Sequence, residues 1–303
     1  MLFNRTITNW DDWARVYQSI PAFENIVQEI LVREQLPIYK IEHLTPGTNA
    51  VFKVGDIVVK IYAPAESGMD QTVDRHTEIF VTRFVRALGV PVPTILAEGV
   101  IYDKYAFAYI VMPYIAGNEL NVALQKADAP TQYKLGRQLR NVTGKLHVPC
   151  EPFNDIDVIH TPNRSDRWQS YPHLFNVQRR EYIDRHNYGD YVLVHGDLCG
   201  GNVLVTDTLM PIDYADAVLA PTCYEHSLVF FEYQAYPHFL KGYFAEAEPL
   251  ELAQDVFSGI LIHDFGGDII RHAFGSIHNF KNLDVLRKKI GLRAERLLMP
   301  LWE

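Results

Sequence analysis

The chain has 303 residues, of which 48% are hydrophobic and 21% are charged. This balance is typical of a protein that buries a hydrophobic core, and it excludes disorder as a description of the whole chain. Lys plus Arg number 28 and Asp plus Glu number 37, which gives a net charge of −9 at pH 7. Because no cluster of five or more basic residues offsets this charge, it disfavours nucleic acid as a partner and favours a cationic small molecule.

Cysteine content and hydropathy indicate the compartment. Cys150, Cys199 and Cys223 are an odd number with no CxxC pair, so the sequence predicts neither a disulfide framework nor a thiolate metal site. The N-terminus lacks a long apolar run, and the most apolar stretch, 107–116, is about half of the ~20 residues that a membrane-spanning helix needs. We therefore expect a soluble cytoplasmic protein with no membrane partner.

The N-terminal part changes from helical to β texture. Helical patterns over 10–19 and 22–33 are followed by the runs IYKIEHL, VFKV and IVVKIY. The strings PGTNA and GD, both turn-formers, separate these runs, which predicts an antiparallel meander. Apolar residues at mostly three- and four-residue spacings then predict an amphipathic helix over 70–88, which Gly89 ends. Two more strands are expected, over 95–100 and 105–112.

From residue 117 onward the pattern is mainly helical, with helices expected over 119–126, 132–147 and 174–185 and throughout the region after Cys223. The exception is a β patch, VLVHGD followed by NVLVTDTLMPIDYAD, which predicts a hairpin set into a helical lobe. The longest loop is expected over 154–170. The change of pattern predicts an N-terminal lobe over 1–112, a linker over 113–118 and a C-terminal lobe over 119–303.

The most specific motif is HGDLCGGN at 195–202, in which the carboxylate of Asp197 is followed five positions later by the carboxamide of Asn202. Phosphoryl transfer explains this spacing, because the Asp can orient an acceptor hydroxyl and receive its proton while the Asn supplies an oxygen to Mg²⁺. Magnesium prefers hard oxygen ligands, so a second carboxylate is expected, and Asp213 in PIDYAD is that carboxylate. The alternative is a turn with Asp and Gly for backbone reasons and Asn as a cap.

Together, HGDLCGGNVLV and PIDYADA resemble the catalytic and metal-binding segments of the aminoglycoside phosphotransferase and choline kinase-like family, which has a protein-kinase-like fold. A His-Gly-Asp-x4-Asn match arises by chance in roughly one chain of this length in a thousand. The resemblance implies a two-lobed α+β protein, with an antiparallel sheet plus helix in a small N-terminal lobe and a larger, mainly helical C-terminal lobe. Such a protein would use Mg-ATP or Mg-GTP to phosphorylate a hydroxyl of a small molecule, with His195 fixing the loop by hydrogen bonds.

A kinase-like small lobe also needs a strand lysine that contacts the nucleotide phosphates and a helix glutamate that holds it. The resemblance implies Lys60 in IVVKIY as this lysine and Glu78 as this glutamate, with Glu66 and Asp74 as weaker candidates. The alternative interpretations are an edge-strand lysine that faces water and a glutamate on a solvated helix face.

Two further segments would contact the nucleotide. PGTNA takes the place of the phosphate-covering loop, where backbone N–H groups around Gly47 and Thr48 could donate to phosphate oxygens, although the same string is also an ordinary hairpin turn. In the linker, the resemblance implies that the Pro113 carbonyl accepts from the exocyclic amine of the base and that the Ile115 N–H donates to the ring. Proline has no N–H, so it suits only the acceptor role. Met112 would lie at the back of the purine pocket; the alternative is that it is an ordinary residue of the hydrophobic core.

The chain also departs from the family pattern. The string DFG at 264–266 spells the metal-binding triplet of protein kinases, yet it follows the motif by about sixty residues within a helical region, so a helix-end or turn role is expected. The triplet in the right place is DYA at 213–215. The family often has His-Pro where this chain has Cys199 and Gly200, and Glu225 could replace a downstream acid that braces the loop.

Several classes of acceptor are compatible with these motifs. The family name and the net charge favour an aminoglycoside or aminosugar, while choline, ethanolamine, homoserine, a sugar or a macrolide are reachable with the same catalytic residues. A non-catalytic nucleotide-binding protein of the same fold is a further alternative, which the presence of all four motif residues disfavours. The acids of the C-terminal lobe that could face ammonium groups, or form a solvated surface, are Asp216, Glu225, Glu232, Asp264 and Asp268.

Overall fold

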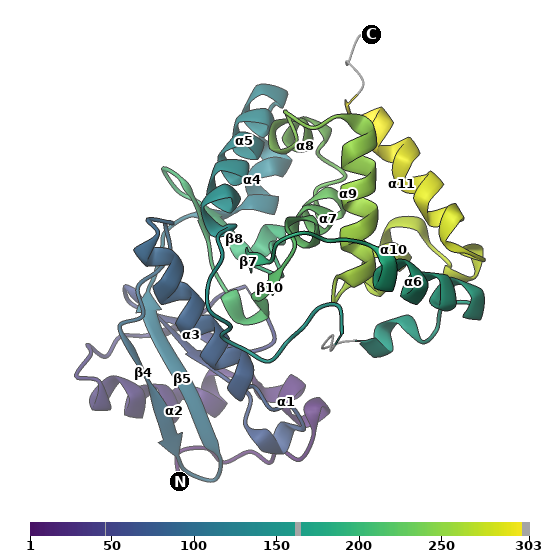
Figure 1. Ribbon diagram of the computed structural model, residues 1–303. Helices are drawn as coiled ribbons and strands as arrows, with labels where there is room; N and C mark the ends of the chain where they lie inside the picture. The colour runs from purple at the N-terminus through teal and green to yellow at the C-terminus, as the bar shows by residue number, and fades with distance from the viewer. Residues whose placement is uncertain (46, 161–164, 299–303) are drawn as a thin grey trace. The chain divides into compact units, whose positions relative to one another are not determined.

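The computed structural model describes residues 1–45, 47–160 and 165–298 (Figure 1). Its residues group into two compact units. The first contains Met1–Ala87 and Val92–Ala116, and the second contains Leu88–Pro91 and the described residues of Gly117–Glu303. The grouping therefore changes between Ala116 and Gly117, within the segment predicted from the sequence as a linker.

The first unit is built on a five-stranded sheet with the order β1-β2-β3-β5-β4, in which all neighbours are antiparallel. The predicted meander is confirmed, and the helix predicted over 70–88 is α3. Gly89, with a φ of 75°, follows α3 as the expected terminator. The elements, with η for 3-10 helices, are α1 (Trp10–Val16), α2 (Ile20–Arg33), β1 (Ile41–His43), β2 (Ala50–Val54), β3 (Ile57–Ile61), η1 (Ala65–Ser67), α3 (Thr72–Ala87), β4 (Ala97–Tyr102) and β5 (Ala106–Pro113).

The two faces of this sheet are covered by different helices, and Figure 1 shows α2 and α3 on opposite sides of it. Side chains alternate between the faces along each strand. Val59 of β3 and Val111 of β5 lie in one buried core with Phe23 of α2. Ile110 of β5 lies on the other face, in a smaller buried cluster with Ile79 of α3. The face that a strand residue occupies therefore decides which helix it meets.

The second unit is mainly helical, with α9 packed against α7 and α11 and α5 packed against α8. Among the described helices, none combines the length and apolar composition that crossing a bilayer requires. The elements are β6 (Asn118–Glu119), α4 (Leu120–Lys126), α5 (Ala129–Leu146), η2 (Ser165–Trp168), α6 (His173–Arg185), β7 (Val192–Val194), η3 (Gly200–Asn202), β8 (Val203–Val205), β9 (Leu209–Pro211), η4 (Tyr214–Asp216), β10 (Val218–Ala220), α7 (Thr222–Glu232), α8 (Pro237–Tyr243), α9 (Pro249–Ile262), α10 (Gly266–Phe274), η5 (Ile277–Asn279) and α11 (Leu283–Leu298).

The β patch in this unit differs from the single predicted hairpin. β8 and β9 form a hairpin that β6 joins, but β7 pairs with β10 in a separate sheet. Residues 195–202 lie between β7 and β8, and this stretch is too long for a tight hairpin turn. Of the long loop predicted over 154–170, residues 161–164 lie outside the described residues, and the described part contains η2.

Candidate active site

The first unit contains a buried ion pair on the α3 face of its sheet. Lys60 lies on β3, and its Nζ donates to Glu78 Oε2 of α3 at 2.6 Å. The Tyr62 hydroxyl, two residues along the same strand face, donates to the same oxygen at 2.6 Å. Lys60 is 4% and Glu78 is 2% exposed, and β3 lies in the middle of the sheet, so the edge-strand alternative for Lys60 is wrong.

We expect Lys60→Met to lower the free energy of unfolding by about 3–5 kcal/mol, because the substitution removes the cation that pairs with the buried Glu78 carboxylate. Lys53→Met is the matched control, since Lys53 lies on the neighbouring β2 and forms a partly exposed pair with Glu42. Such a pair contributes about 0–1 kcal/mol. Urea unfolding of both variants measures the difference. Equal losses of unfolding free energy in the two variants would contradict a stabilising role for the buried Lys60–Glu78 pair.

The backbone segments predicted to contact a nucleotide also lie in this unit. Gly47 and Thr48 are exposed, and among the described residues their N–H groups have no hydrogen-bond partner. Pro46 of the same loop lies outside the described residues. In the linker, the Tyr114 N–H donates to the Asp56 carbonyl at 2.8 Å, continuing the ladder between β3 and β5.

The geometry of an antiparallel ladder then orients the linker groups. Alternate residues of an extended strand direct their N–H and C=O groups to opposite sides. Pro113 lies opposite Ile57, one residue before Tyr114, so its carbonyl points away from β3. Met112 is partly buried and packs against the cluster on the α3 face. Packing against this core is therefore enough to explain a methionine at position 112, whether or not a ligand is bound.

In the second unit, the motif at 195–202 forms a loop whose first residue, His195, is fixed by hydrogen bonds to α7 and to Ile212. The His195 N–H donates to Glu225 Oε2 of α7 at 2.7 Å, and His195 Nε2 donates to the Ile212 carbonyl at 3.0 Å. Glu225 is fully buried. Burial would raise the pKa of Glu225, but hydrogen bonds and charge from His147 and His195 outweigh burial and lower it. An ionised carboxylate thus braces the start of the loop.

Gly196 is the tightest point of this loop. Its φ is +82°, and a Cβ added there would lie 1.9 Å from the Asp216 carbonyl oxygen. We expect Gly196→Ala to cost more stability than Gly189→Ala, where φ is +74° and nothing lies within 4 Å. The Gly189 variant meets only the left-handed backbone penalty, about 1–2 kcal/mol. Denaturant unfolding compares the two, and equal losses would contradict the close approach.

Asp197 and Asn202 meet across the loop. Asn202 Nδ2 donates to the Asp197 carbonyl at 2.9 Å and to Asp197 Oδ2 at 3.0 Å. The Asn202 N–H donates to the Cys199 carbonyl at 3.0 Å, which fixes the turn. Because the amide nitrogen of Asn202 is occupied by Asp197, its side-chain oxygen is the atom that can face a cation.

Negative charge surrounds Asp197. Its pKa is raised to about 6, first by burial and then by Asp216, with Asp213 and Glu232 adding to the effect and His195 opposing it. An ionised Asp197 therefore lies in a negative potential, which a cation near the loop would relieve.

Asp213 is an exposed carboxylate on a strained backbone. Its φ of 62° lies in the left-handed region, which Asp adopts more readily than most residues with a side chain. The N–H of Ile212, the residue before Asp213, donates to the Asn202 carbonyl at 2.9 Å. This hydrogen bond joins the two backbone segments that carry Asn202 and Asp213, the residues predicted to bind magnesium. Among the described residues, no group of three His, Cys, Asp or Glu side chains is arranged to hold a metal.

The five acids predicted to face an acceptor differ in their surroundings. Glu225 is buried under the loop, and Asp264 is 5% exposed in the turn between α9 and α10, so neither is available to solvent. Asp268 is half-buried and accepts from both Arg167 and Arg271, which neutralise its charge.

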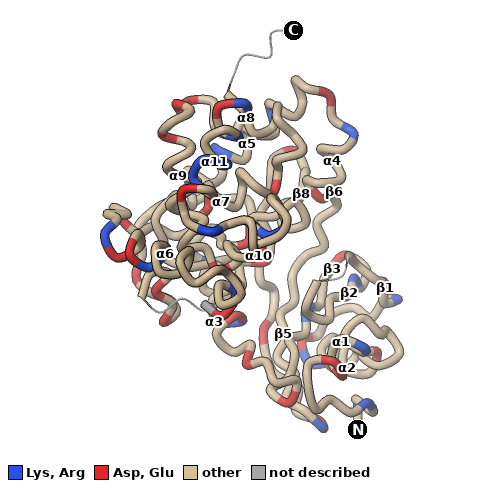
Figure 2. The backbone as a smooth tube through the Cα atoms, turned by 90° about the vertical axis from the view of Figure 1, so that its right-hand side faces the viewer, with Lys and Arg blue, Asp and Glu red and all other residues tan. Residues whose placement is uncertain are grey.

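Two of the five acids remain as candidates. Asp216 is partly exposed, and Glu232 is exposed while its Oε1 accepts from the Gly200 N–H at 3.1 Å. These two also raise the pKa of Asp197. Figure 2 shows the acidic positions interspersed with Lys and Arg along both units.

Sequence reasoning missed two residues of these clusters. Tyr62 could have been found, because positions 60 and 62 of IVVKIY share a strand face. His147, the C-terminal cap of α5, has its Nε2 3.9 Å from Glu225 Oε2. No local pattern signals His147, since its partner is distant in sequence.

Comparison with known proteins gives a consistent result. A family model described as "Phosphotransferase enzyme family" matches residues 44–254. A mutant aminoglycoside 2'-phosphotransferase-IIIa with GDP has 17% identity and a TM-score of 0.60, covering 91% of this chain and 95% of its own. A choline/ethanolamine kinase family protein from Mesorhizobium loti has 16% identity and a TM-score of 0.57, and the match covers 91% of this chain and 96% of that protein. No curated protein sequence matches this chain.

A third solved structure is the ternary complex of APH(2")-IIa with streptomycin and ATP, with 16% identity and a TM-score of 0.57, covering 86% of this chain and 96% of its own. At these identities the likeness concerns the fold. The two-lobed, protein-kinase-like α+β fold predicted from the sequence is confirmed.

Proposed function

Because the chain belongs to the phosphotransferase enzyme family, we propose that it is a kinase that transfers the γ-phosphate of ATP, or of GTP, to a hydroxyl group of an aminoglycoside or another aminosugar. The observation that carries this proposal is the bonded pair Asp197 and Asn202 within a group of carboxylates. ATP and GDP are bound in two of the similar structures, which supports a nucleoside triphosphate as the phosphate donor.

Asp197 is the proposed catalytic residue. Its Oδ2 accepts from Asn202, which leaves Oδ1 to accept a hydrogen bond from the acceptor hydroxyl. As the hydroxyl oxygen forms its bond to the γ-phosphorus, the bond to the nucleoside diphosphate breaks and the hydroxyl proton passes to Asp197. A carboxylate whose pKa is raised to about 6 is a stronger base than an ordinary aspartate and remains ionised at neutral pH.

The residues of the second unit fit a magnesium ion. Asn202 offers its side-chain oxygen and Asp213 an exposed carboxylate, both hard oxygen donors of the kind Mg²⁺ prefers. Few protein ligands are needed, since Mg²⁺ usually keeps several waters and the substrate phosphates. When bound with the nucleotide, Mg²⁺ would neutralise charge on the phosphate oxygens.

The first unit supplies the proposed nucleotide contacts. Lys60, oriented by Glu78, would pair with the phosphates, and the free N–H groups of Gly47 and Thr48 would donate to phosphate oxygens. The orientation of the Pro113 carbonyl supports its role as acceptor from the base. The neighbouring Ile115 N–H is proposed as the donor to the ring, and Met112 as the residue behind the purine.

The charge around Asp197 supports a cationic acceptor. Asp216 and Glu232 both raise the pKa of Asp197, and the described hydrogen bond of Glu232 comes from the Gly200 N–H and not from a basic side chain. Ammonium groups on the acceptor would pair with these carboxylates, which places an aminosugar ahead of a neutral sugar, homoserine or a macrolide. Choline and ethanolamine carry one positive charge each and form the second choice.

Salt dependence tests the acceptor class. For a polycationic aminosugar we expect the KM to rise steeply between 0.1 and 1 M salt, because the Debye length falls from ~10 Å to ~3 Å. A neutral sugar should show far less dependence. The measurement is kcat/KM for each acceptor at saturating Mg-ATP, with the nucleotide dependence measured separately. A flat profile for an acceptor with several ammonium groups would contradict recognition by carboxylates.

A further inference from the structure

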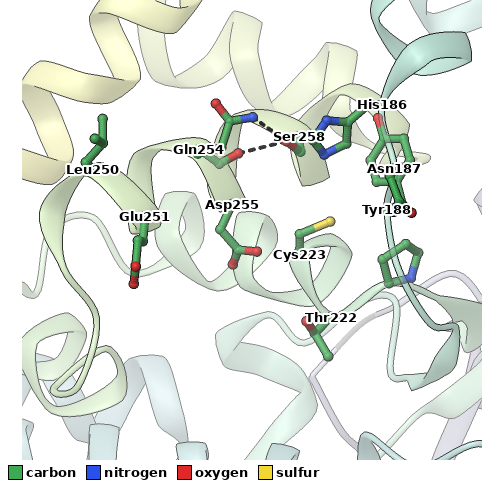
Figure 3. A pocket seen from close by; sticks show the side chains of 11 residues that line it. His186, Asn187, Tyr188, Thr222, Cys223, Leu250, Glu251, Gln254, Asp255 and Ser258 are labelled. Carbon is green, nitrogen blue, oxygen red and sulfur yellow. Dashed lines mark hydrogen bonds between the residues drawn. The ribbon is translucent and has the colours of Figure 1, made fainter.

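The second unit has a pocket of about 600 Å³ between the start of α7, the N-terminal two-thirds of α9 and the segment at the end of α6 (Figure 3). This volume suits a small molecule. None of the acids predicted from the sequence to face an acceptor lines it. The lining residues are His186, Asn187, Tyr188, Pro221, Thr222, Cys223, Leu250, Glu251, Gln254, Asp255 and Ser258.

The charge of the pocket is negative. Glu251 and Asp255 are one turn apart on α9, and Figure 3 shows their carboxylates pointing the same way from the helix. Among the described lining residues none is a lysine or an arginine. Within the described chain, Glu251 also has no ion-pair or hydrogen-bond partner. Two carboxylates therefore line the pocket, and no described lysine or arginine lines it with them.

The side chain that contacts Asp255 is a histidine, not a lysine or an arginine. His226 Nδ1 donates to Asp255 Oδ2 at 2.6 Å, and Arg140 donates to His226 Nε2 at 2.6 Å. Burial lowers the pKa of His226, with Arg140 and His147 acting in the same direction against Asp255. The imidazole is therefore neutral at pH 7, and Arg140 lies on its far side, outside the pocket.

A cysteine lies beside Asp255 at the pocket wall. Cys223 is 7% exposed at the pocket wall, and its pKa is raised first by burial and then by Asp255. Its neighbour on α7, Thr222, contributes a hydroxyl to the lining.

The remaining lining is suited to a hydroxylated ligand. Thr222, Ser258 and Asn187 provide hydroxyl and amide groups, while His186 and Tyr188 present two rings whose centroids are 4.6 Å apart. Aromatic faces attract an ammonium group as well as apolar carbon. Leu250, 82% exposed, is the one large aliphatic side chain among the described lining residues.

We propose that this pocket binds a small hydroxylated ammonium compound, whose positive group pairs with Glu251 and Asp255. Charge-assisted hydrogen bonds to the carboxylates would supply most of the affinity, and the hydroxyl and amide groups would hold the rest of the ligand. This site is separate from the acceptor site proposed at Asp197, with which it shares no residue. It does not depend on the proposed kinase activity.

The test is calorimetric titration of the nucleotide-free protein at low ionic strength with 1-amino-1-deoxyglucitol, using glucitol as the neutral counterpart. The amine should bind and glucitol should bind at least tenfold more weakly. Glu251→Gln should weaken amine binding about fivefold, the effect expected of one partly exposed pair worth about 1 kcal/mol. Glu251→Gln combined with Asp255→Asn should weaken it further, since Asn keeps an acceptor for His226.

The matched control is Glu248→Gln, which removes an exposed acid from the start of the same helix outside the pocket. Amine binding should be unchanged in this variant. Equal binding of amine and glucitol, or no effect of the Glu251 and Asp255 variants, would overturn the proposal. Loss of amine binding in Asp216→Asn alone would place the amine at the acceptor site instead, which overturns the pocket but leaves the proposed function standing.

Discussion

Asp197→Asn is expected to lower kcat by at least ~100-fold, the scale of a lost general base, while nucleotide affinity stays nearly unchanged. The substitution keeps the size of the side chain, and an Asn oxygen can still accept from Asn202 Nδ2. What disappears is the carboxylate that would receive the hydroxyl proton. Steady-state kinetics with saturating acceptor, together with nucleotide titration of the variant, measure the two effects.

Stability separates this effect from misfolding. The pKa of Asp197 is raised from 3.8 to about 6 in the folded chain, so stability falls as the pH rises between these two values, and a neutral Asn removes that loss at pH 7. The melting temperature of Asp197→Asn at pH 7 should therefore equal or exceed that of the parent. Asp207→Asn, the same change at an exposed position of the neighbouring hairpin, should leave kcat unaltered. Phosphorylation by Asp197→Asn near the parent rate would refute the catalytic assignment.

The second large effect concerns magnesium. Removal of the Asp213 carboxylate should abolish the magnesium-dependent part of the stabilisation by ATP, because a ligand raises stability by RT ln(1 + [L]/Kd) only when it binds the folded state. Asp213→Gly is the suitable variant, since glycine adopts the observed φ of 62° without strain. Thermal melting with ATP, in the presence of Mg²⁺ and of a chelator, gives the magnesium-dependent shift.

Asp264→Ala tests the competing DFG string at 264–266. Asp264 is buried, so this variant is expected to melt at a lower temperature without ligand. Its magnesium-dependent shift with ATP should nevertheless match that of the parent. If the shift vanished in Asp264→Ala and survived in Asp213→Gly, the metal assignment would have to move to Asp264.

The sequence was most informative where a functional residue belongs to a regular element. The family resemblance implied a strand lysine and a helix glutamate, and the β pattern of IVVKIY and the helix predicted over 70–88 located them at Lys60 and Glu78, which the structure pairs at 2.6 Å. The same alternation contained Tyr62, whose hydroxyl bonds to the same carboxylate. The spacing of Asp197 and Asn202 likewise encodes a local turn in which both side chains meet.

The sequence was least informative where contacts join distant segments. Strand pairing of β7 with β10 depends on the path of the loop between β7 and β8, which no local pattern specifies. The surroundings of each acid also depend on tertiary packing. Glu225 is buried beneath His195, and Asp268 is neutralised by two arginines, one of them about a hundred residues away in the chain.

Acceptor-dependent phosphate transfer is the most direct test of the proposed kinase. The purified protein is incubated with Mg-ATP or Mg-GTP and a panel of aminoglycosides, amino alcohols and neutral sugars, and nucleotide consumption is measured together with the mass of each acceptor. We expect an aminosugar to accelerate nucleotide consumption and to gain the mass of one phosphoryl group, and both changes should be absent with Asp197→Asn. Consumption that no acceptor stimulates, with every acceptor mass unchanged, would contradict a small-molecule kinase.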